Sequence, residues 1–286
     1  MKVMDGVRRG WRFGWVVSCA VVLGAASALA EEPTSAIAAL MEKSGLNVQI
    51  GQLPAVMLGE LEQMQQQKLP AAQFDQITNA IAKSFDPARM TKGVRDRLAK
   101  TLSAEDMKST LTWLTSPIGE KVTALEKAAA SAEAAQARQA FDAELQKGGP
   151  RVEQLKRLNR AVKGSEHALE MASESAVAIR VALEASATPS KQPDLQLVKE
   201  QVRPELERIK PMLEQQMLLS LLYTYRDLPD EDLAKYIGFA ETEPGKRYHQ
   251  ATMSALSEEV AAASSRMGEL LGKTLKDTPR PAEAAK

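Results

Sequence analysis

Apolar residues recur at every third or fourth position along most of this sequence, which is the period of one face of an α-helix. Two stretches carry the pattern most clearly: Leu46, Ile50, Leu53, Met57, Leu61 and Met64, then Phe74, Ile77, Ile81 and Phe85. Alanine, glutamate, glutamine and leucine, which are strong helix formers, recur throughout, and the alternation typical of strands is scarce. The sequence therefore predicts an all-α protein.

Residues 102–122 predict a helical hairpin. Ser103 begins its first helix in a capping-box pattern with Asp106. Ser116-Pro117 ends that helix and starts another, and Gly119 allows the two backbones to approach closely at the bend. A long alanine-rich helix is expected after the bend, as far as the Gly-Gly-Pro break at residues 148–150.

Residues 228–248 align with residues 102–122 without a gap. Four positions are identical, and they place Leu228, Glu231, Asp232 and Gly245 on Leu102, Glu105, Asp106 and Gly119. Phe239 falls on Trp113, and the acidic turn and the bend coincide. We therefore expect two diverged copies of one helical repeat, residues 31–149 and 150–274, each ending in a hairpin with a long last helix. Residues 275–286 lack a face to bury and are expected to form a disordered tail.

Residues 1–30 have the three regions of a secretory signal peptide: arginines, an apolar stretch and a small-residue cleavage pattern that ends at Ala30. The alternatives are an uncleaved membrane anchor and a lipid on Cys19, the only cysteine. Cleavage after Ala30 predicts a periplasmic protein with no disulfide and no membrane span. It also removes a surplus of basic residues and leaves a mildly acidic chain, which does not favour nucleic acid.

With these residues in view, the two hairpins resemble the bacterial family called domain of unknown function 2059. The first copy matches its pattern through Glu105, Asp106, Trp113, Ser116, Pro117, Gly119 and Lys121, and the second through Glu231, Asp232, Phe239, Thr242, Gly245, Lys246 and Arg247. Leu114, Ala240 and the displaced Pro244 depart from it. The resemblance implies an exported helical protein with no established activity, and it supplies no catalytic residue.

No catalytic residue, cofactor or metal site is predicted. The two histidines, His167 and His249, lack metal-binding spacing, and His249 is expected to be a partly exposed helix residue. The carboxylates at 105–106 and 231–232 either form an acid/base or cation site or favour helix N-termini, and we expect the second. The basic residues Lys121, Lys246 and Arg247 bind an anion or form a solvated face, and again we expect the second.

These observations predict a periplasmic interaction protein, a scaffold or chaperone-like binder of another envelope protein. The alternative is a carrier of a small apolar ligand between helices, since methionines such as Met57 and Met107 suit adaptable apolar surfaces. Aromatic residues are only 4% of the chain, so a large aromatic-lined pocket is not expected. The residues expected to hold the hairpins are Asp106, Trp113, Gly119, Asp232, Phe239 and Gly245. We expect Trp113 and Phe239 each to pack its hairpin against the rest of its own copy.

Overall fold

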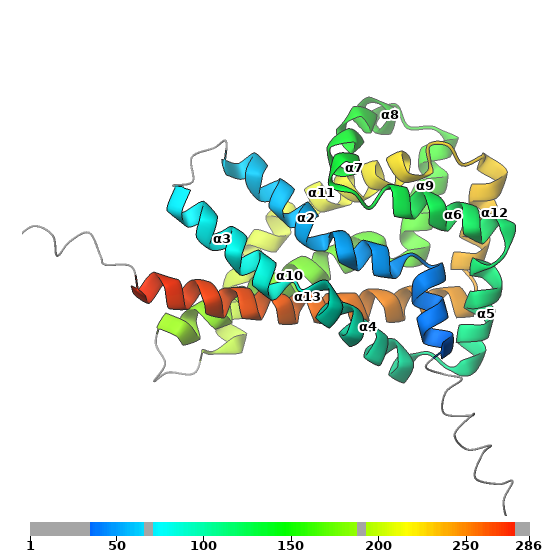
Figure 1. Cartoon of the computed structure of the whole chain (residues 1–286). Coiled ribbons are helices and arrows are strands. Elements are labelled where there is room, and N and C mark those ends of the chain that lie inside the picture. Colours follow the sequence, from blue (N-terminus) through cyan, green and yellow to red (C-terminus); the bar gives the residue numbers. More distant parts are fainter. Residues whose placement is uncertain (1–34, 66–70, 188–192, 278–286) are drawn as a thin grey trace, which may run out of the picture.

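The computed structural model describes residues 35–65, 71–187 and 193–277, and every regular element in these ranges is a helix (Figure 1). The all-α prediction is confirmed. A helix over residues 35–43 is followed by α2 (Leu46–Gln65), α3 (Ala71–Ser84), α4 (Pro87–Thr101), α5 (Ala104–Leu114), α6 (Pro117–Ala128), α7 (Ala132–Ala137), the 3₁₀ helix η1 (Arg138–Phe141), α8 (Asp142–Lys147), α9 (Pro150–Val162), α10 (Gly164–Ala187), α11 (Leu195–Tyr225), α12 (Asp230–Ala240) and α13 (Glu243–Asp277).

The predicted signal peptide, with its cleavage site at Ala30, lies outside the described residues. Most of the predicted C-terminal tail does too, although α13 continues through Asp277 into its first residues. Within the described ranges, no helix is both long enough and apolar enough to cross a membrane.

Helix α13 is the central element of the fold. It runs along most of the molecule and packs against α10, α3, α4 and α5 (Figure 1). Small side chains permit this close packing: Ala251, Ala255 and Ala263 are buried, and a Cβ at Gly268 would lie 2.8 Å from the carbonyl oxygen of Ile179 on α10. The last helix in the sequence is therefore the helix around which the earlier ones assemble.

Two large hydrophobic clusters and a small third one form the core, and the two large clusters draw on both predicted repeats. The first joins residues 37–114 to residues 248–267 of α13. The second joins Val122 of α6 to α9, the end of α11 and α12. The boundary predicted at 149–150 therefore does not separate two cores, and the division into repeats stays a prediction from the sequence.

The expected long helix after the first bend is wrong. Helix α6 ends at Ala128, and three short helices cover the rest of that segment. Ser131 accepts a hydrogen bond from the Ala134 N–H at 3.2 Å and so starts a new helix, while Arg138 donates to the carbonyl oxygen of Ala129 at 2.9 Å. These caps satisfy backbone groups that a continuous helix would satisfy internally, and the alanine-rich stretch has no large apolar stripe to hold it straight.

Candidate binding site between the two hairpins

The bend between α5 and α6 is closed by a serine and a glycine. The Ser116 hydroxyl donates to the carbonyl oxygen of Trp113 at 2.6 Å and accepts from the Gly119 N–H at 3.1 Å. A Cβ at Gly119 would lie 2.0 Å from the same carbonyl oxygen. The close approach predicted at Gly119 is therefore confirmed, and a side chain at this position collides with backbone.

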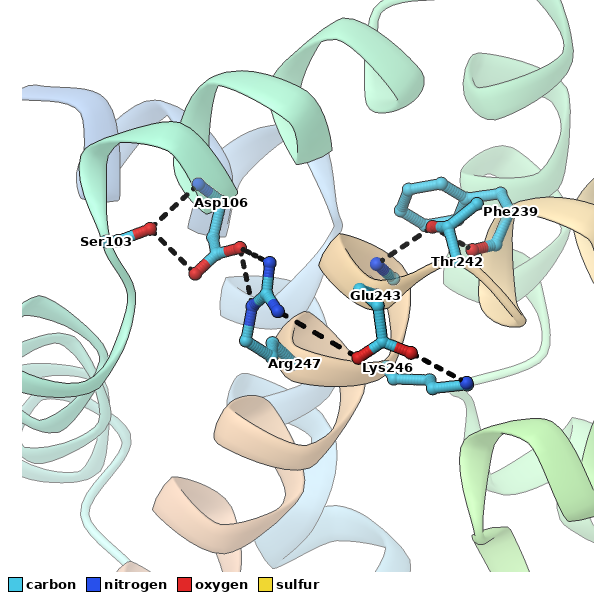
Figure 2. Close-up of polar contacts among 8 residues, drawn as sticks. Ser103, Asp106, Phe239, Thr242, Glu243, Lys246 and Arg247 are labelled. Atoms are coloured by element: carbon cyan, nitrogen blue, oxygen red, sulfur yellow. Dashed lines mark hydrogen bonds and ion pairs between the residues drawn. The ribbon is translucent and has the colours of Figure 1, made fainter.

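The bend between α12 and α13 has the same construction. The Thr242 hydroxyl donates to the carbonyl oxygen of Phe239 at 2.7 Å and accepts from the Gly245 N–H at 3.1 Å (Figure 2). A Cβ at Gly245 would lie 2.1 Å from that carbonyl oxygen. The displaced proline at 244 thus leaves the geometry of the bend unchanged.

An ion pair joins the start of α5 to α13. Two guanidinium nitrogens of Arg247 lie 2.7 Å from one carboxylate oxygen of Asp106, and the Ser103 hydroxyl donates to the other oxygen at 2.7 Å (Figure 2). These bonds, chiefly the one from Arg247, lower the pKa of Asp106. Asp106 is buried, while Arg247 is half exposed, so the contact seals the edge of the first core.

A second ion pair joins α6 to the start of α12. Lys121 lies 3.0 Å from the carboxylate of Asp232, which also accepts from Lys235 at 3.1 Å, and both lower the pKa of Asp232. In the gapless alignment Asp232 corresponds to Asp106, and Lys121 corresponds to Arg247. Each hairpin therefore supplies a carboxylate that pairs with a basic side chain of the other hairpin.

The structure shows what the other charged residues of the two hairpins contact. Asp106 and Asp232 lie in the first turns of α5 and α12, as expected, while Glu105 and Glu231 are exposed. No cluster of three or more possible metal ligands occurs among the described residues. Lys121 and Arg247 are exposed, as expected of a solvated basic face, and each also pairs with a carboxylate of the other hairpin. Lys246 pairs locally, 2.9 Å from Glu243 (Figure 2).

Trp113 and Phe239 stack on each other between the hairpins. Their ring centroids are 4.7 Å apart and the planes differ by 7°. Each ring is partly buried and contacts both hydrophobic clusters. The expectation that each ring would pack within its own copy is therefore wrong. The two equivalent aromatic residues instead fasten one hairpin to the other.

A cavity of about 190 Å³ lies beside this stack. Its walls come from α2, α5, α6, the α9–α10 turn, α11, α12 and α13. The aromatic side chains in the lining are Trp113, Tyr225, Tyr236, Phe239, Tyr248 and His249. Three of the four tyrosines of the chain thus meet at one place, so the few aromatic residues are concentrated around one small cavity.

Glu126 of α6 supplies the carboxyl group of this cavity. Its Oε1 accepts hydrogen bonds from the Tyr225 hydroxyl at 2.6 Å and from the Tyr236 hydroxyl at 3.2 Å. Burial raises the pKa of Glu126 more than these bonds lower it, and it raises the pKa of both tyrosines well above the usual value. The surroundings thus favour the neutral carboxylic acid.

His249 of α13 presents a buried imidazole to the same cavity. Its Nε2 has no hydrogen-bond partner among the described residues. Burial, assisted by the nearby His167, lowers the pKa of His249 to about 4, so the ring is neutral at pH 7. The ring lies among Tyr236, Phe239 and Tyr248, and His249 as a whole is partly exposed, as expected, although its Nε2 is buried.

The residues of α6 and α13 that line the cavity stand at equivalent positions in the gapless alignment of the two hairpins. Residues 122, 123 and 126 of α6 line it, and so do the three aligned positions of α13, residues 248, 249 and 252. An extension of the alignment by one helical turn would have marked these positions together. Glu126, Tyr225, Tyr236 and His249 were missed because nothing in the local sequence says that the two hairpins interlock.

The fold and the cavity define an all-α protein with a polar and aromatic site between two interlocked hairpins. Residues 88–146, from α4 to α8, match the model of a family described as "Uncharacterized protein conserved in bacteria (DUF2059)". The resemblance is thereby confirmed for the segment that holds the first hairpin, and the match does not extend to the second. No curated protein and no solved structure matches the chain.

Proposed function

We propose that this chain is an exported binding protein that holds a small ligand in the cavity between its two hairpins. The observation that carries the proposal is the buried Nε2 of His249, which faces an aromatic cavity without a hydrogen-bond partner among the described residues. Buried polar groups in proteins are nearly always paired, and those left unpaired often mark a functional site. A bound molecule with a complementary polar group would supply this partner.

The size and walls of the cavity support a small, partly apolar ligand. An apolar cavity of ~150 Å³ is large enough for benzene, so the volume here suits a ligand of similar or slightly larger size. Met217 and Met253 line it beside the rings, and methionine side chains adapt their shape to what they contact. Export rests on the pattern of residues 1–30, and the two-copy architecture rests on the register that the ion pairs and the bends share.

A scaffold with an apolar partner surface has less support. Among the described residues, the large apolar side chains that are exposed are scattered: Val48 on α2, and Leu195, Leu197 and Met212 on α11. Single exposed apolar residues are ordinary on a protein surface. We also propose binding without catalysis, because no hydroxyl or carboxyl group of the described residues is hydrogen-bonded to the His249 ring.

Native mass spectrometry of the full chain, purified from its own envelope, tests this function. We expect a bound small molecule that is released on unfolding. A Met253→Trp variant fills the cavity and should lose this molecule, whereas Met212→Trp makes the same change at an exposed position of α11 and should keep it. Protein that carries no small molecule and takes up no small aromatic or aliphatic probe would contradict the proposal. A stable second polypeptide would favour the scaffold instead.

A further inference from the structure

The lining of the cavity contains a single carboxyl group and no basic side chain. Glu126 is the only acidic residue, no lysine or arginine is present in the lining, and His249 is neutral. Arg138 shares a neighbouring pocket with Glu126 and donates to the carbonyl oxygen of Ala129. The charge that this site can present is therefore only negative, so it disfavours an anionic ligand.

The hydrogen bonds of Glu126 leave part of its carboxyl group available. Tyr225 and Tyr236 both donate to Oε1. Oε2 makes no hydrogen bond with any described residue. Both phenols therefore act as donors to one oxygen and fix the orientation of the carboxyl group, while the second oxygen can accept from a ligand.

Aromatic rings surround this acid. Trp113, Phe239 and Tyr236 lie nearly parallel, with 11° or less between Trp113 and each of the other two, and Tyr225 meets Tyr236 edge to face at 5.8 Å. The face of an aromatic ring attracts a cation, most strongly where water is excluded, and cages of aromatic rings are a known way to recognise quaternary ammonium groups. An acid without a partner cation and an aromatic wall are thus complementary to the same kind of ligand.

We propose that the ligand of this cavity is a small organic cation, an alkyl- or arylammonium ion held between the Glu126 carboxylate and the rings of Trp113, Tyr225 and Tyr236. The inference rests on the proposed binding function and names its ligand class. The ammonium group donates to Oε2 of Glu126, and the hydrocarbon part lies against Met217, Met253 and the aromatic wall. The carboxyl group is ionised in the complex, and any proton that it holds in the free protein passes to solvent.

The test uses three ligands that share one ring and differ in charge. Benzylammonium, benzyl alcohol and benzoate are titrated into the full chain at pH 7 by isothermal titration calorimetry. We expect benzylammonium to bind at least about tenfold more tightly than benzyl alcohol, since charge-assisted hydrogen bonds are roughly twice as strong as neutral ones, and benzoate not to bind. Repeating the titration in buffers of different ionisation enthalpy should reveal proton release with benzylammonium alone.

A Glu126→Gln variant distinguishes the effect of the carboxylate charge on binding from the effect of the cavity's shape. It should weaken benzylammonium binding to the level of benzyl alcohol and abolish proton release, and a cooperative urea denaturation shows that the variant is folded. Glu105→Gln, at an exposed position, should change nothing. If benzyl alcohol binds as tightly as benzylammonium, or if Glu126→Gln binds benzylammonium as tightly as the wild type does, the proposed cationic ligand is contradicted. The proposed binding function is not affected by either result. If none of the three ligands binds to the wild-type chain, both proposals are overturned.

Discussion

Glu126 and His249 are ionisable side chains held in surroundings that favour their neutral forms. Each would be charged or partly charged in water, and each loses hydration in the cavity. For Glu126 the raised pKa means that the group stabilises the fold below its ordinary pKa and that this contribution is lost as pH rises through the folded value. As far as Glu126 is concerned, the free energy of unfolding is therefore lower at neutral pH than below the ordinary pKa of a glutamate.

Because the pKa of His249 is lowered in the fold, the free energy of unfolding should decrease in mildly acidic solution. Its value falls from 6.5 in the unfolded chain to about 4 in the fold, so the unfolded state takes up the proton first. The stabilising contribution is complete above pH 6.5 and is lost as pH falls toward 4, at about 1.4 kcal/mol per pH unit and ~3 kcal/mol in total. Urea denaturation at pH 7, 6 and 5 should record this loss.

A His249→Gln variant provides the control for this measurement. Glutamine does not titrate, so the difference in unfolding free energy between wild type and variant should narrow as pH falls from 6.5 to 5. The carboxylates of Asp106 and Asp232 lose their ion pairs only at lower pH, because their pKa values are lowered, and they are common to both proteins. A difference that is independent of pH would mean that the imidazole is not desolvated.

At the scale of the element, the tight bends decide which residues the hairpins tolerate. Gly119→Ala places a methyl group against the backbone carbonyl of Trp113, and we expect it to cost ~1–3 kcal/mol, as overpacking does. Gly238→Ala, in the middle of α12 with open space around its Cβ, should instead stabilise by ~0.5–1 kcal/mol through helix propensity. Urea denaturation of both variants gives the comparison. If both substitutions changed the free energy of unfolding by the same amount and in the same direction, the close backbone contact at the bend would not be what requires Gly119.

The helices that sequence analysis found are those whose start and end signals are local. The Ser103 cap and the Ser116 cap both occur where predicted. The early end of α6 was missed because it depends on Arg138, which reaches back to the carbonyl of Ala129 in the folded chain. Local signals thus gave the elements, whereas tertiary contacts set where some of them stop.

The same distinction applies to the candidate site: local sequence signals predict some of its residues, and tertiary contacts bring the others together. Trp113 and Phe239 were found as equivalent anchors because they stand at matching positions of one gapless register. Their contact with each other, and the meeting of Glu126 with Tyr225, depend on how α6 lies against α11 and α12. No periodicity within one helix contains that information, since it is a relation between segments far apart in the sequence.

At the scale of the whole molecule, the stack of Trp113 on Phe239 connects the two hydrophobic clusters. Changing Trp113 to alanine should destabilise the protein by about 2–3 kcal/mol, less than the ~3–5 kcal/mol of a fully buried ring, because part of the indole stays in solvent. Since the two rings act as a pair, a double-mutant cycle with Phe239→Ala should give a coupling of ~0.5–1.5 kcal/mol. Additive effects in chemical denaturation would mean that the rings stabilise their hairpins separately.

The position of α13 at the end of the sequence has a consequence for the time at which this chain can fold. The first hydrophobic cluster joins residues 37–114 to residues 248–267, so its centre is filled by residues that are synthesised last. Loop closure over such a separation costs entropy before any contact offsets it, which slows folding. During synthesis the N-terminal helices therefore have no helix to pack around. The chain completes its fold only after its last helix has been synthesised. A truncation within α13 would therefore remove the helix against which residues 37–114 pack.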